Sequence, residues 1–546
     1  MSLDRLWPYL LLAVACGALI PMMIRASGEF IGYDGFWHVF IATQNRWKLF
    51  LFEYKNNAHP PIFMMLLRLV ALFGHSRLIL RSISMAAGFG SICLIGLIAR
   101  RLCGDRLVAL LAAAAYAFSV TMLEINLEVR SYPLCLFFVV AAFYFLIDPL
   151  AHAFDSKARR SLVLWGIFSS LAIGTEYYAI FFVLACVACL PLFVLTRHEL
   201  RQRITGWTAA DWAQILFAVI LPFATIIYFY RAHIRHQPAN YAHVIDFYWN
   251  PGTSALAFVL RNLRADLNFV LPFQIMSTPA LLVFVVIAAL LVLLFLFLRR
   301  RRGGIPIAAL PASMSVVLLT ELIAASLLRR YPFGGFDRQQ SILFPFLFLT
   351  AFVLLDQVIS FLGAALPLRA AIAALIAFLI GVHFGYGWKR LAHIPTELFT
   401  SEYATYRAKV IPAPAVFLDQ FTLIGYYMQT NDWRWKFRRH LREPNRVDEY
   451  ELTTSSGRHI MLFRDLDTWN FDLHQPFAYQ VLAHSLRDTN LPGANVFLVK
   501  QTKGHADAAG IAAEEDEIRE RAAAAGLRVV SLYDDNEQAD LTFVLQ

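Results

Sequence analysis

Charged side chains are scarce in this chain. They make up 16% of its 546 residues, whereas 58% are hydrophobic and 46 residues are phenylalanine. Because about a quarter of the residues in a typical soluble domain are charged, this composition excludes a soluble globular protein. Windows of about 20 mainly apolar residues recur up to about residue 388, after which the composition becomes mixed. The sequence therefore predicts a polytopic α-helical membrane protein followed by a soluble region.

Cysteine is also rare, and several cofactor motifs are absent. The six cysteines all lie in or beside apolar stretches and none follows Cys189, which argues against a disulfide framework or a cysteine-based metal site. The sequence has no H-E-x-x-H, and its C-terminal region has no Gly-rich phosphate loop or G-x-G-x-x-G. We therefore predict no cofactor. A divalent metal held by His38, His59 and nearby acids stays the less favoured alternative.

Eleven stretches have the length and composition of membrane-spanning helices. They cover residues 7–24, 82–100, 106–123, 132–148, 160–175, 177–196, 211–230, 279–298, 306–327, 341–361 and 368–387. The first has no convincing small-residue cleavage site, so we interpret it as an uncleaved anchor. With a cytoplasmic N-terminus, five successive inner connections are basic and meet the positive-inside rule. They carry Arg100/Arg101/Arg106, Lys157/Arg159/Arg160, Arg197/Arg201/Arg203, Arg299 to Arg302, and Arg369. Much of the net charge of +9 lies in such loops, so it does not indicate a nucleic acid partner.

The apolar run from Ile62 to Phe73 decides the topology. It is too short for a span and follows two prolines, so we interpret it as an interfacial helix in the first outer loop, residues 25–81. An odd number of spans then places the C-terminal region outside. We predict a membrane domain over residues 1–388 and an extracytoplasmic α/β domain over 389–546. Its predicted strands are AVFLD, RHIMLFRD, NVFLVKQ, RVVSLYDD and ADLTFVLQ, and its predicted helices are FTLIGYYMQ and AAEEDEIRERAAAAG.

Acidic and imidazole groups gather in the first outer loop. Asp34 and His38 lie in GYDGFWHVF, and His59 opens the sequence His-Pro-Pro. A carboxylate at a helix end can act as a general base toward an acceptor hydroxyl or amine, and Asp34 is the candidate for that role. The alternative is that Asp34 only caps the helix that runs through FWHVFIAT.

The next two outer loops carry further ionisable residues. In LEINLEVRSYPL, Glu124 and Glu128 are four apart and share a face if helical, and Arg130 and Tyr132 follow. Arginine suits bidentate binding of a phosphate, and a neighbouring glutamate can orient it, although an arginine at a membrane edge can also be a simple anchor. Glu176, in GTEYY, lies at the outer end of a tight helical hairpin, where an ionisable group needs a cavity or a partner.

The order of these motifs resembles the GT-C superfamily of membrane glycosyltransferases. The resemblance points to the glycosyltransferase family 39-like proteins, which include protein O-mannosyltransferases and the aminoarabinose transferase of lipid A, and it covers about residues 7–390. The matching positions are Asp34, His59-Pro60-Pro61, Arg81 with Ser84, Ala99 to Leu102, Glu128/Arg130/Tyr132, Thr175-Glu176-Tyr177, and Arg338 with Pro345. Two positions depart from the family pattern: Gly35 stands where a second acid is usual, and Glu176 where a histidine is common.

The resemblance implies a sugar donor linked to a polyprenyl phosphate, an acceptor that is a lipid, a glycan or a protein, and inversion at the anomeric carbon. It also implies a bacterial inner membrane with a periplasmic active site. Asp34 would take the acceptor proton, Glu128 would orient Arg130, and Arg130 and Arg338 would hold the lipid phosphate. The other expected substrate-binding residues are His38, His59, Tyr132, Glu176 and Tyr177.

Two other classes of protein fit the same composition. A transporter or lipid flippase for a lipid-linked or anionic substrate also needs many helices, but such proteins commonly place polar residues at mid-depth. Here the ionisable residues collect at the predicted outer ends of the helices. A non-catalytic subunit of a membrane assembly is the third interpretation, and it predicts that Asp34 is dispensable for the activity of the host pathway.

Overall fold

The computed structural model describes most of the chain. The described residues are 3–29, 31–55, 57–151, 156–196, 202, 207–236, 247–270, 306–361, 363, 366–392, 415–418, 435–442, 447–454, 459–465, 476–489, 495–501, 508–527, 529–535 and 540–545. The chain divides into two compact units. The membrane unit consists of residues 1–27, 54–70 and 80–394, and the second unit consists of residues 28–53, 71–79 and 395–546.

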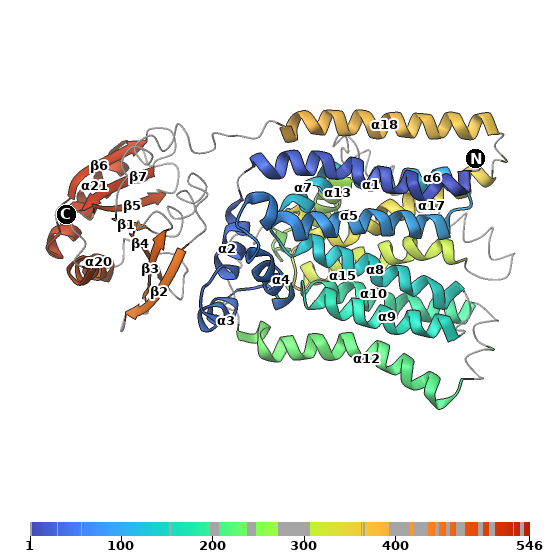
Figure 1. Cartoon of the computed structure of the whole chain (residues 1–546), viewed down its shortest axis with the longest axis horizontal. Coiled ribbons are helices and arrows are strands. Elements are labelled where there is room, and N and C mark those ends of the chain that lie inside the picture. The colour runs from blue at the N-terminus through green and yellow to red at the C-terminus, as the bar shows by residue number, and fades with distance from the viewer. Residues whose placement is uncertain are drawn as a thin grey trace. The chain divides into compact units, whose positions relative to one another are not determined.

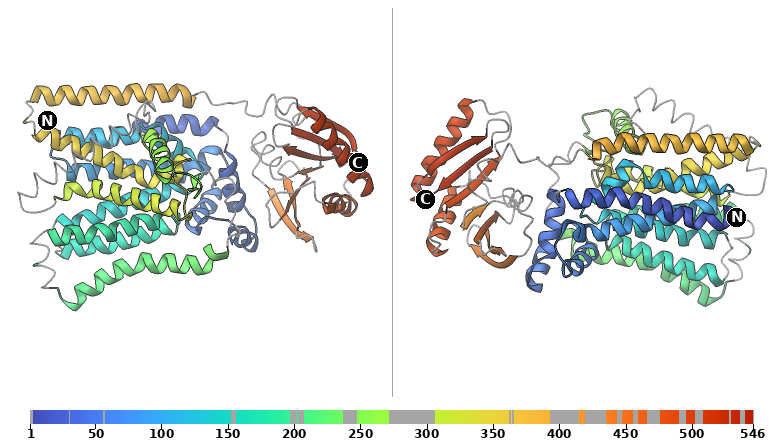
Figure 2. Two further views of the ribbon diagram at one scale, coloured as in Figure 1. Left: turned by 180° about the vertical axis from the view of Figure 1, so that it is seen from behind. Right: turned by 45° about the horizontal axis from the view of Figure 1, so that its top comes forward.

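Long helices that run side by side form the membrane unit (Figure 1), and the two views of Figure 2 show the same arrangement. Its helices are α1 (Leu3–Gly28), α4 (Pro61–Ala71), α5 (Arg77–Leu102), α6 (Arg106–Ala117), α7 (Val120–Leu127), α8 (Tyr132–Ala151), α9 (Ser156–Ile173), α10 (Ala179–Thr196), α12 (Ala209–Ala232), α13 (Ala255–Val270), α15 (Leu310–Leu327), α16 (Asp337–Gln340), α17 (Phe344–Phe361) and α18 (Leu366–Ala392).

The polytopic helical class is confirmed, but the count of eleven spans is not. Eight helices among the described residues are long and apolar enough to cross a membrane. A ninth span is possible if α6 and α7, which are bent by 55° at their junction, count as one. Helix α9 lies where a span was predicted but opens with the basic sequence SKARR. The predicted span 279–298 and the basic residues Arg197, Arg201, Arg203 and Arg299 to Arg302 lie outside the described residues.

A short apolar helix follows His59-Pro60, as the sequence predicts, and its interfacial location stays a prediction. Helix α4 begins at Pro61 and ends at Ala71, which makes it a short apolar helix rather than a candidate span. Its start is tied to the hairpin that joins α9 and α10, because the amide of Ile62 donates a hydrogen bond to the carbonyl of Gly174 at 3.0 Å.

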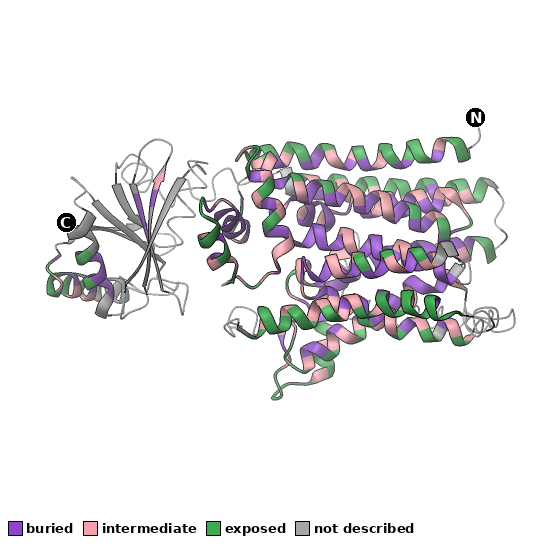
Figure 3. Cartoon of the chain, turned by 60° about the horizontal axis from the view of Figure 1, so that its bottom comes forward, coloured by how far each residue is buried: buried purple, intermediate pink, exposed green. Residues whose placement is uncertain are grey.

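Burial separates central helices from peripheral ones. In the Tyr132–Leu150 span 72% of the residues in its most apolar window are buried, whereas in the Pro367–Lys389 span the share is 6%. Figure 3 shows buried residues in the middle of the bundle and exposed residues on its outer helices. Helix α8 packs on α9, α9 on α12, α10 on α15, and α17 on both α15 and α6. The outer helix α18 contacts α6 and α7.

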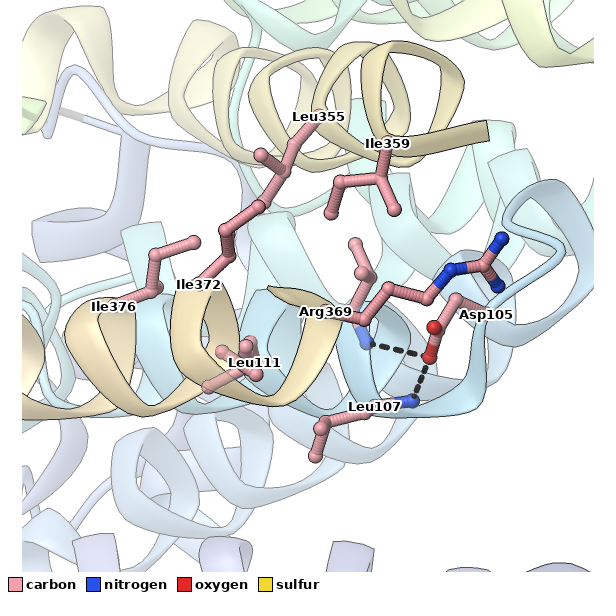
Figure 4. A pocket seen from close by; sticks show the side chains of 10 residues that line it. Asp105, Leu107, Leu111, Leu355, Ile359, Arg369, Ile372 and Ile376 are labelled. Atoms are coloured by element: carbon pink, nitrogen blue, oxygen red, sulfur yellow. Dashed lines mark hydrogen bonds between the residues drawn. The ribbon is translucent and has the colours of Figure 1, made fainter. Parts of the chain in front are cut away.

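A small apolar pocket lies between α6, α17 and α18 (Figure 4). Leu111, Leu355 and Ile376 are among its lining residues, and Asp105 and Arg369 line it as well. The Asp105 carboxylate caps α6 by accepting hydrogen bonds from the amides of Leu107 and Val108. The turn between α5 and α6 is also held in place, because the Asp356 carboxylate accepts hydrogen bonds from the backbone amides of Gly104 and Asp105.

The second unit contains a mixed seven-stranded sheet with the strand order β2-β3-β4-β1-β5-β7-β6. Its strands are β1 (Ala415–Leu418), β2 (Trp435–Arg442), β3 (Val447–Thr454), β4 (His459–Asp465), β5 (Asn495–Gln501), β6 (Val529–Asp535) and β7 (Asp540–Leu545). β1 is parallel to β4 and β5, and the other pairs are antiparallel.

All five strands predicted in the C-terminal region are present, and so is the helix predicted at AAEEDEIRERAAAAG, which is α21 (Ala508–Ala524). β2, β3 and helix α20 (Pro476–Thr489) were not predicted. The helix predicted at FTLIGYYMQ lies outside the described residues. The same unit also holds α2 (Tyr33–Ala42) and most of α3 (Trp47–Lys55). The extracytoplasmic location of the C-terminal region stays a prediction.

Candidate active site

The link between α7 and α8 carries three of the predicted site residues. Helix α7 ends at Leu127, and Glu128 already has an extended backbone with φ −68° and ψ 140°. The condition under which Glu124 and Glu128 would share a helical face is therefore not met, because the helix stops before Glu128. The extended backbone leads through the buried Arg130 to Tyr132, the first residue of α8.

Helix α5 holds this link in place through two residues that the family resemblance had marked. The buried guanidinium of Arg81 donates hydrogen bonds to the carbonyl of Leu127 at 2.8 Å and to the carbonyl of Ala26 at 3.0 Å. One turn further, the Ser84 hydroxyl donates to the carbonyl of Arg130 at 3.4 Å. Charge-assisted hydrogen bonds of this kind are among the stronger ones in proteins, so the link is fixed on both sides of Glu128.

Arg130, His59 and Glu176 form a chain of polar contacts. Nη2 of Arg130 lies 3.4 Å from Nε2 of His59, and Nδ1 of His59 lies 2.8 Å from Oε1 of Glu176. A guanidinium can only donate and a carboxylate can only accept, so this chain requires the His59 proton on Nδ1 and a lone pair on Nε2. The Ser131 hydroxyl also donates to Glu176 Oε1. The predicted partner for Glu176 is therefore found, and it is His59 together with Ser131.

Arg338 reaches the same link from α16. Its Nη1 lies 3.6 Å from Oε1 of Glu128, and its guanidinium lies 5.0 Å from the ring centre of Phe336. The side chains of this ion pair are 24% and 37% exposed, so the pair orients the two groups more than it stabilises the fold. Glu128 thus has Arg338 as an ion-pair partner, which the sequence did not predict; its expected effect on Arg130 stays a prediction.

The loop before α16 depends on glycine. Gly334 has a φ of +75°, which side chains with a Cβ rarely adopt, and a Cβ there would lie 2.7 Å from Asn262 of α13. Close approach of the Gly334 backbone to α13 therefore fixes the loop that delivers Arg338. Helix α13 is in turn tied to α7, because the Thr121 hydroxyl donates to the carbonyl of Phe269 at 2.8 Å.

Tyrosines line the other side of Arg130. The Arg130 guanidinium donates to the Tyr132 hydroxyl at 3.2 Å, and the Tyr132 ring stacks on Tyr178 with 6.1 Å between ring centres. Tyr178 contacts Tyr331, and its hydroxyl lies 3.2 Å from that of Ser341. Burial raises the pKa of Tyr178 and of Tyr331, so both hydroxyls keep their protons at neutral pH. The sequence had not indicated Tyr331 or Ser341.

Tyr177 faces a second histidine. Its hydroxyl lies 2.5 Å from Nδ1 of His233, and Nε2 of His233 lies 3.3 Å from the carbonyl of Tyr54. The rings of Tyr54 and His233 stack with 5.0 Å between their centres. Burial lowers the pKa of His233. No motif in the sequence marks His233, so its contact with Tyr177 was not predicted.

Asp34 and His38 belong to α2 in the second unit. The N-cap of α2 is Gly32 and no side chain caps the helix, so the alternative interpretation of Asp34 as an N-cap is wrong. Asp34 lies in the first turn of α2, where a carboxylate is favoured by the helix dipole. His38 is buried, and its Nδ1 donates to the carbonyl of Asp34 at 2.8 Å. Helix α2 therefore sets both residues one turn apart.

The described residues contain no group of three or more His, Cys, Asp and Glu side chains that is placed to hold a metal ion. His59 uses Nδ1 to contact Glu176 and Nε2 to contact Arg130. Both ring nitrogens are thus engaged with protein groups in this arrangement.

Replacing Glu176 by alanine should destabilise the membrane unit by roughly 1–3 kcal/mol, because the buried Ser131 hydroxyl and His59 would lose their acceptor. The measurement is thermal unfolding of the purified protein in detergent. Glu176→Gln keeps one acceptor oxygen and serves as the matched control, with a smaller expected loss. Equal stability of Glu176→Ala and the wild type would contradict the described contacts.

The fold and the site together define the class of protein, which is a polytopic helical membrane protein with a polar site. The site brings together two guanidiniums, a histidine, two carboxylates and several tyrosines at the starts of α4, α8, α10 and α16. Such a set of donors suits a phosphate group. It does not require a bound nucleotide.

Comparison with known proteins shows which family and which solved structures this chain resembles. A family model described as dolichyl-phosphate-mannose-protein mannosyltransferase matches residues 69–237. The crystal structure of ArnT from Cupriavidus metallidurans in the apo state is 13% identical with a TM-score of 0.58, and the match covers 100% of this chain and 98% of that chain. The crystal structure of ArnT from the same organism bound to undecaprenyl phosphate is also 13% identical with a TM-score of 0.58, covering 98% and 97%. No curated protein matches the sequence.

At this level of identity the likeness shows the fold alone: the chain has an ArnT-like fold. The resemblance to the GT-C superfamily and its family 39-like members is therefore confirmed. The region matched by the family model contains Glu128, Arg130, Tyr132, Glu176 and Tyr177. Asp34, His38, His59 and Arg338 lie outside it.

Proposed function

We propose that this chain is an integral membrane glycosyltransferase that moves a sugar from a polyprenyl-phosphate-linked donor to an acceptor on the outer face of the membrane. The convergence of two guanidinium groups on the link between α7 and α8 carries the proposal. Arg130 belongs to this link and donates to the Tyr132 hydroxyl at 3.2 Å, and Arg338, from a segment far away in the sequence, lies 3.6 Å from the Glu128 carboxylate of the same link. Two cations at one short link suit a lipid phosphate that gains negative charge as it leaves the sugar.

The proposed reaction is a single displacement with inversion. Asp34 accepts the proton of the acceptor hydroxyl or amine, whose oxygen or nitrogen forms a bond to the anomeric carbon. The bond from that carbon to the phosphate oxygen breaks, and the polyprenyl phosphate departs with the electron pair. Arg130 and Arg338 stabilise the charge on that phosphate, and Glu128 orients Arg338.

His59 and Glu176 act by positioning in this proposal. The carboxylate of Glu176 holds the His59 proton on Nδ1, which leaves Nε2 as an acceptor for Arg130. The guanidinium is thereby held beside the Tyr132 hydroxyl rather than free to turn away. Because a phosphate is a good leaving group, accurate placement of charge supplies much of the acceleration.

The lipid part of the donor follows from chemistry and from the structural neighbours. One of the ArnT structures is bound to undecaprenyl phosphate. The similar fold supports a long polyprenyl chain here as well, since it would lie in the bilayer while its phosphate meets the arginines. The proposed setting is a bacterial inner membrane with a cytoplasmic N-terminus, a periplasmic C-terminal region, and a lipid, glycan or protein as acceptor.

The test is sugar transfer by the purified full chain in detergent. A panel of polyprenyl-phosphate-linked sugars is supplied with crude cell envelope as acceptor, with and without divalent metal, and loss of sugar from the lipid is followed. Turnover of one donor would identify the sugar. If no donor reacts while vesicles containing the protein move a lipid-linked or anionic solute in a flux assay, the transporter interpretation replaces this one.

A further inference from the structure

The pocket between α6, α17 and α18 is apolar along most of its length and charged at one end (Figure 4). On α18 the lining residues form a stripe with helical spacing: Arg369, Ile372, Ala373 and Ile376. Because a helix rises about 1.5 Å per residue, this stripe runs about 10 Å along α18 from the charged end. The pocket encloses about 230 Å³ of empty space, part of it open to the surroundings. That space is too small for a whole phospholipid but accommodates part of one acyl chain.

Ion pairs mark the end of the bundle at which the charged end of the pocket lies. Asp105 directly precedes Arg106, which pairs with Asp4 of α1, and Arg100 lies 3.3 Å from the same Asp4 carboxylate. Charged side chains that stay partly exposed lie at the level of water and lipid headgroups rather than in hydrocarbon. This end is opposite to the candidate active site, because Arg81 holds that site from near the start of α5, whereas Arg100 lies in its last turn. The apolar stripe therefore runs from headgroup level into the bilayer, as an acyl chain does.

Asp105 and Arg369 give the charged end of the pocket one group of each sign. Both hydrogen bonds that cap α6 are accepted by Oδ1 of Asp105, so Oδ2 takes no part in the cap. A guanidinium suits a phosphate, and a carboxylate oxygen suits an ammonium donor. A headgroup with negative charge alone would meet Asp105 as a like charge. A headgroup that carries both a phosphate and a protonated amine complements the two residues together.

We propose that this pocket binds a phospholipid with a phosphoethanolamine headgroup. Arg369 binds the phosphate, and Oδ2 of Asp105 accepts a hydrogen bond from the ammonium. Part of one acyl chain lies along Leu111, Leu355 and Ile376, and the other chain stays in the bilayer. Only 6% of the most apolar window of α18 is buried, so the bound lipid adds contacts between this helix and the bundle. The site is independent of the proposed sugar transfer.

The headgroup preference of the unmodified protein tests this proposal. Native mass spectrometry of the full chain in detergent, freed of endogenous lipid, measures the binding of phosphatidylethanolamine, phosphatidylcholine and phosphatidylglycerol with identical acyl chains. Phosphatidylethanolamine should bind roughly tenfold more tightly than the other two. The methylated ammonium of phosphatidylcholine donates no hydrogen bond, and phosphatidylglycerol has no cation. Equal binding of the three lipids, or tightest binding of phosphatidylglycerol, would overturn the proposal.

Two variants separate the roles of the charged residues. Asparagine is a good N-cap, so Asp105→Asn should leave α6 intact while removing the negative charge, and phosphatidylethanolamine should then bind no better than phosphatidylcholine. Arg369→Gln should weaken the binding of all three lipids roughly tenfold. Arg160→Gln, at an exposed arginine of α9, is the matched control and should bind like the wild type. Unchanged binding of phosphatidylethanolamine by Arg369→Gln would contradict the site.

A pair of neighbouring residues on α18 tests the place of the acyl chain. Ile376 lines the pocket, whereas Leu375 is exposed and is not among the lining residues. Ile376→Ala should weaken the binding of phosphatidylethanolamine roughly threefold, because it removes apolar contact with the chain. Leu375→Ala should leave the binding unchanged. Equal losses in the two variants would show general contact with lipid instead of this pocket, and the proposal would fail.

Discussion

Asp34→Asn is expected to lower the rate of sugar transfer by about 10²–10⁴-fold, the range that a general base contributes. The asparagine side chain has nearly the same shape but cannot take the acceptor proton. The rate is measured as loss of sugar from the polyprenyl-phosphate donor at saturating acceptor. Affinity for the donor should change little, because the proposed task of Asp34 concerns the acceptor.

Glu29→Gln is the matched control for Asp34. It neutralises another acid of the same segment, and transfer should remain at the wild-type rate. Asp34 lies in the first turn of α2 and the N-cap of that helix is Gly32, so Asp34→Asn removes no N-cap residue. Transfer by Asp34→Asn at the wild-type rate would remove Asp34 from the mechanism and favour a non-catalytic role for the residue.

Arg130→Gln is expected to reduce the maximal rate by about 10²–10³-fold, which is the cost of losing one donor that stabilises developing charge. Glutamine keeps a donor group of moderate reach, but it has no charge to place beside the Tyr132 hydroxyl and the leaving phosphate. Single-turnover kinetics of sugar release report this step. Arg130→Lys restores the positive charge but lacks the planar guanidinium that can donate two parallel hydrogen bonds, so it should recover only part of the transfer rate.

The control for Arg130 is Arg264→Gln, which removes an exposed arginine of α13 that has no role in the proposed mechanism. Its transfer rate should equal that of the wild type. If Arg130→Gln weakened donor binding but left the maximal rate intact, Arg130 would hold the phosphate equally well before and during the reaction, and the proposed stabilisation of the leaving group would be wrong.

Much of the site could be predicted because its residues lie at the ends of apolar helices. The hydropathy pattern identifies the helices that begin or end beside Arg130, Tyr132, Glu176 and Tyr177. Because successive helices alternate in direction across a membrane, the predicted topology brings these helix ends to one side. Glu176 was expected to face a cavity or a partner, and the structure supplies a partner in His59. A charged side chain beside the hydrocarbon of a bilayer strongly indicates a partner or a cavity, because leaving the charge unpaired there costs free energy.

The contacts that escaped prediction depend on tertiary structure. His233 meets Tyr177 only because the end of α12 comes close to the α9–α10 hairpin, and no spacing in the sequence expresses that approach. Similarly, the end of α7 before Glu128 follows from hydrogen bonds donated by Arg81 and Ser84 of α5, which hold an extended backbone. A local pattern cannot show that a distant helix competes for those carbonyls.

The strands missed in the C-terminal region have a different cause. β2, with the sequence WKFRRHLR, lies at an edge of the sheet and pairs only with β3. Edge strands commonly carry charged side chains, which discourage further pairing, so β2 lacks the apolar character by which strands are usually recognised. β3, with the sequence VDEYELTT, lies between β2 and β4, but its three acids leave it without an apolar run as well.

The peripheral position of α18 has a consequence for biosynthesis. Only 6% of its most apolar window is buried, so it adds little packing to a bundle whose centre is formed by earlier helices. Helices emerge from the ribosome in order, and the last candidate span along the described chain is also the one with the smallest buried share. Insertion of α18 can therefore lag behind that of the earlier spans without leaving the interior of the bundle exposed.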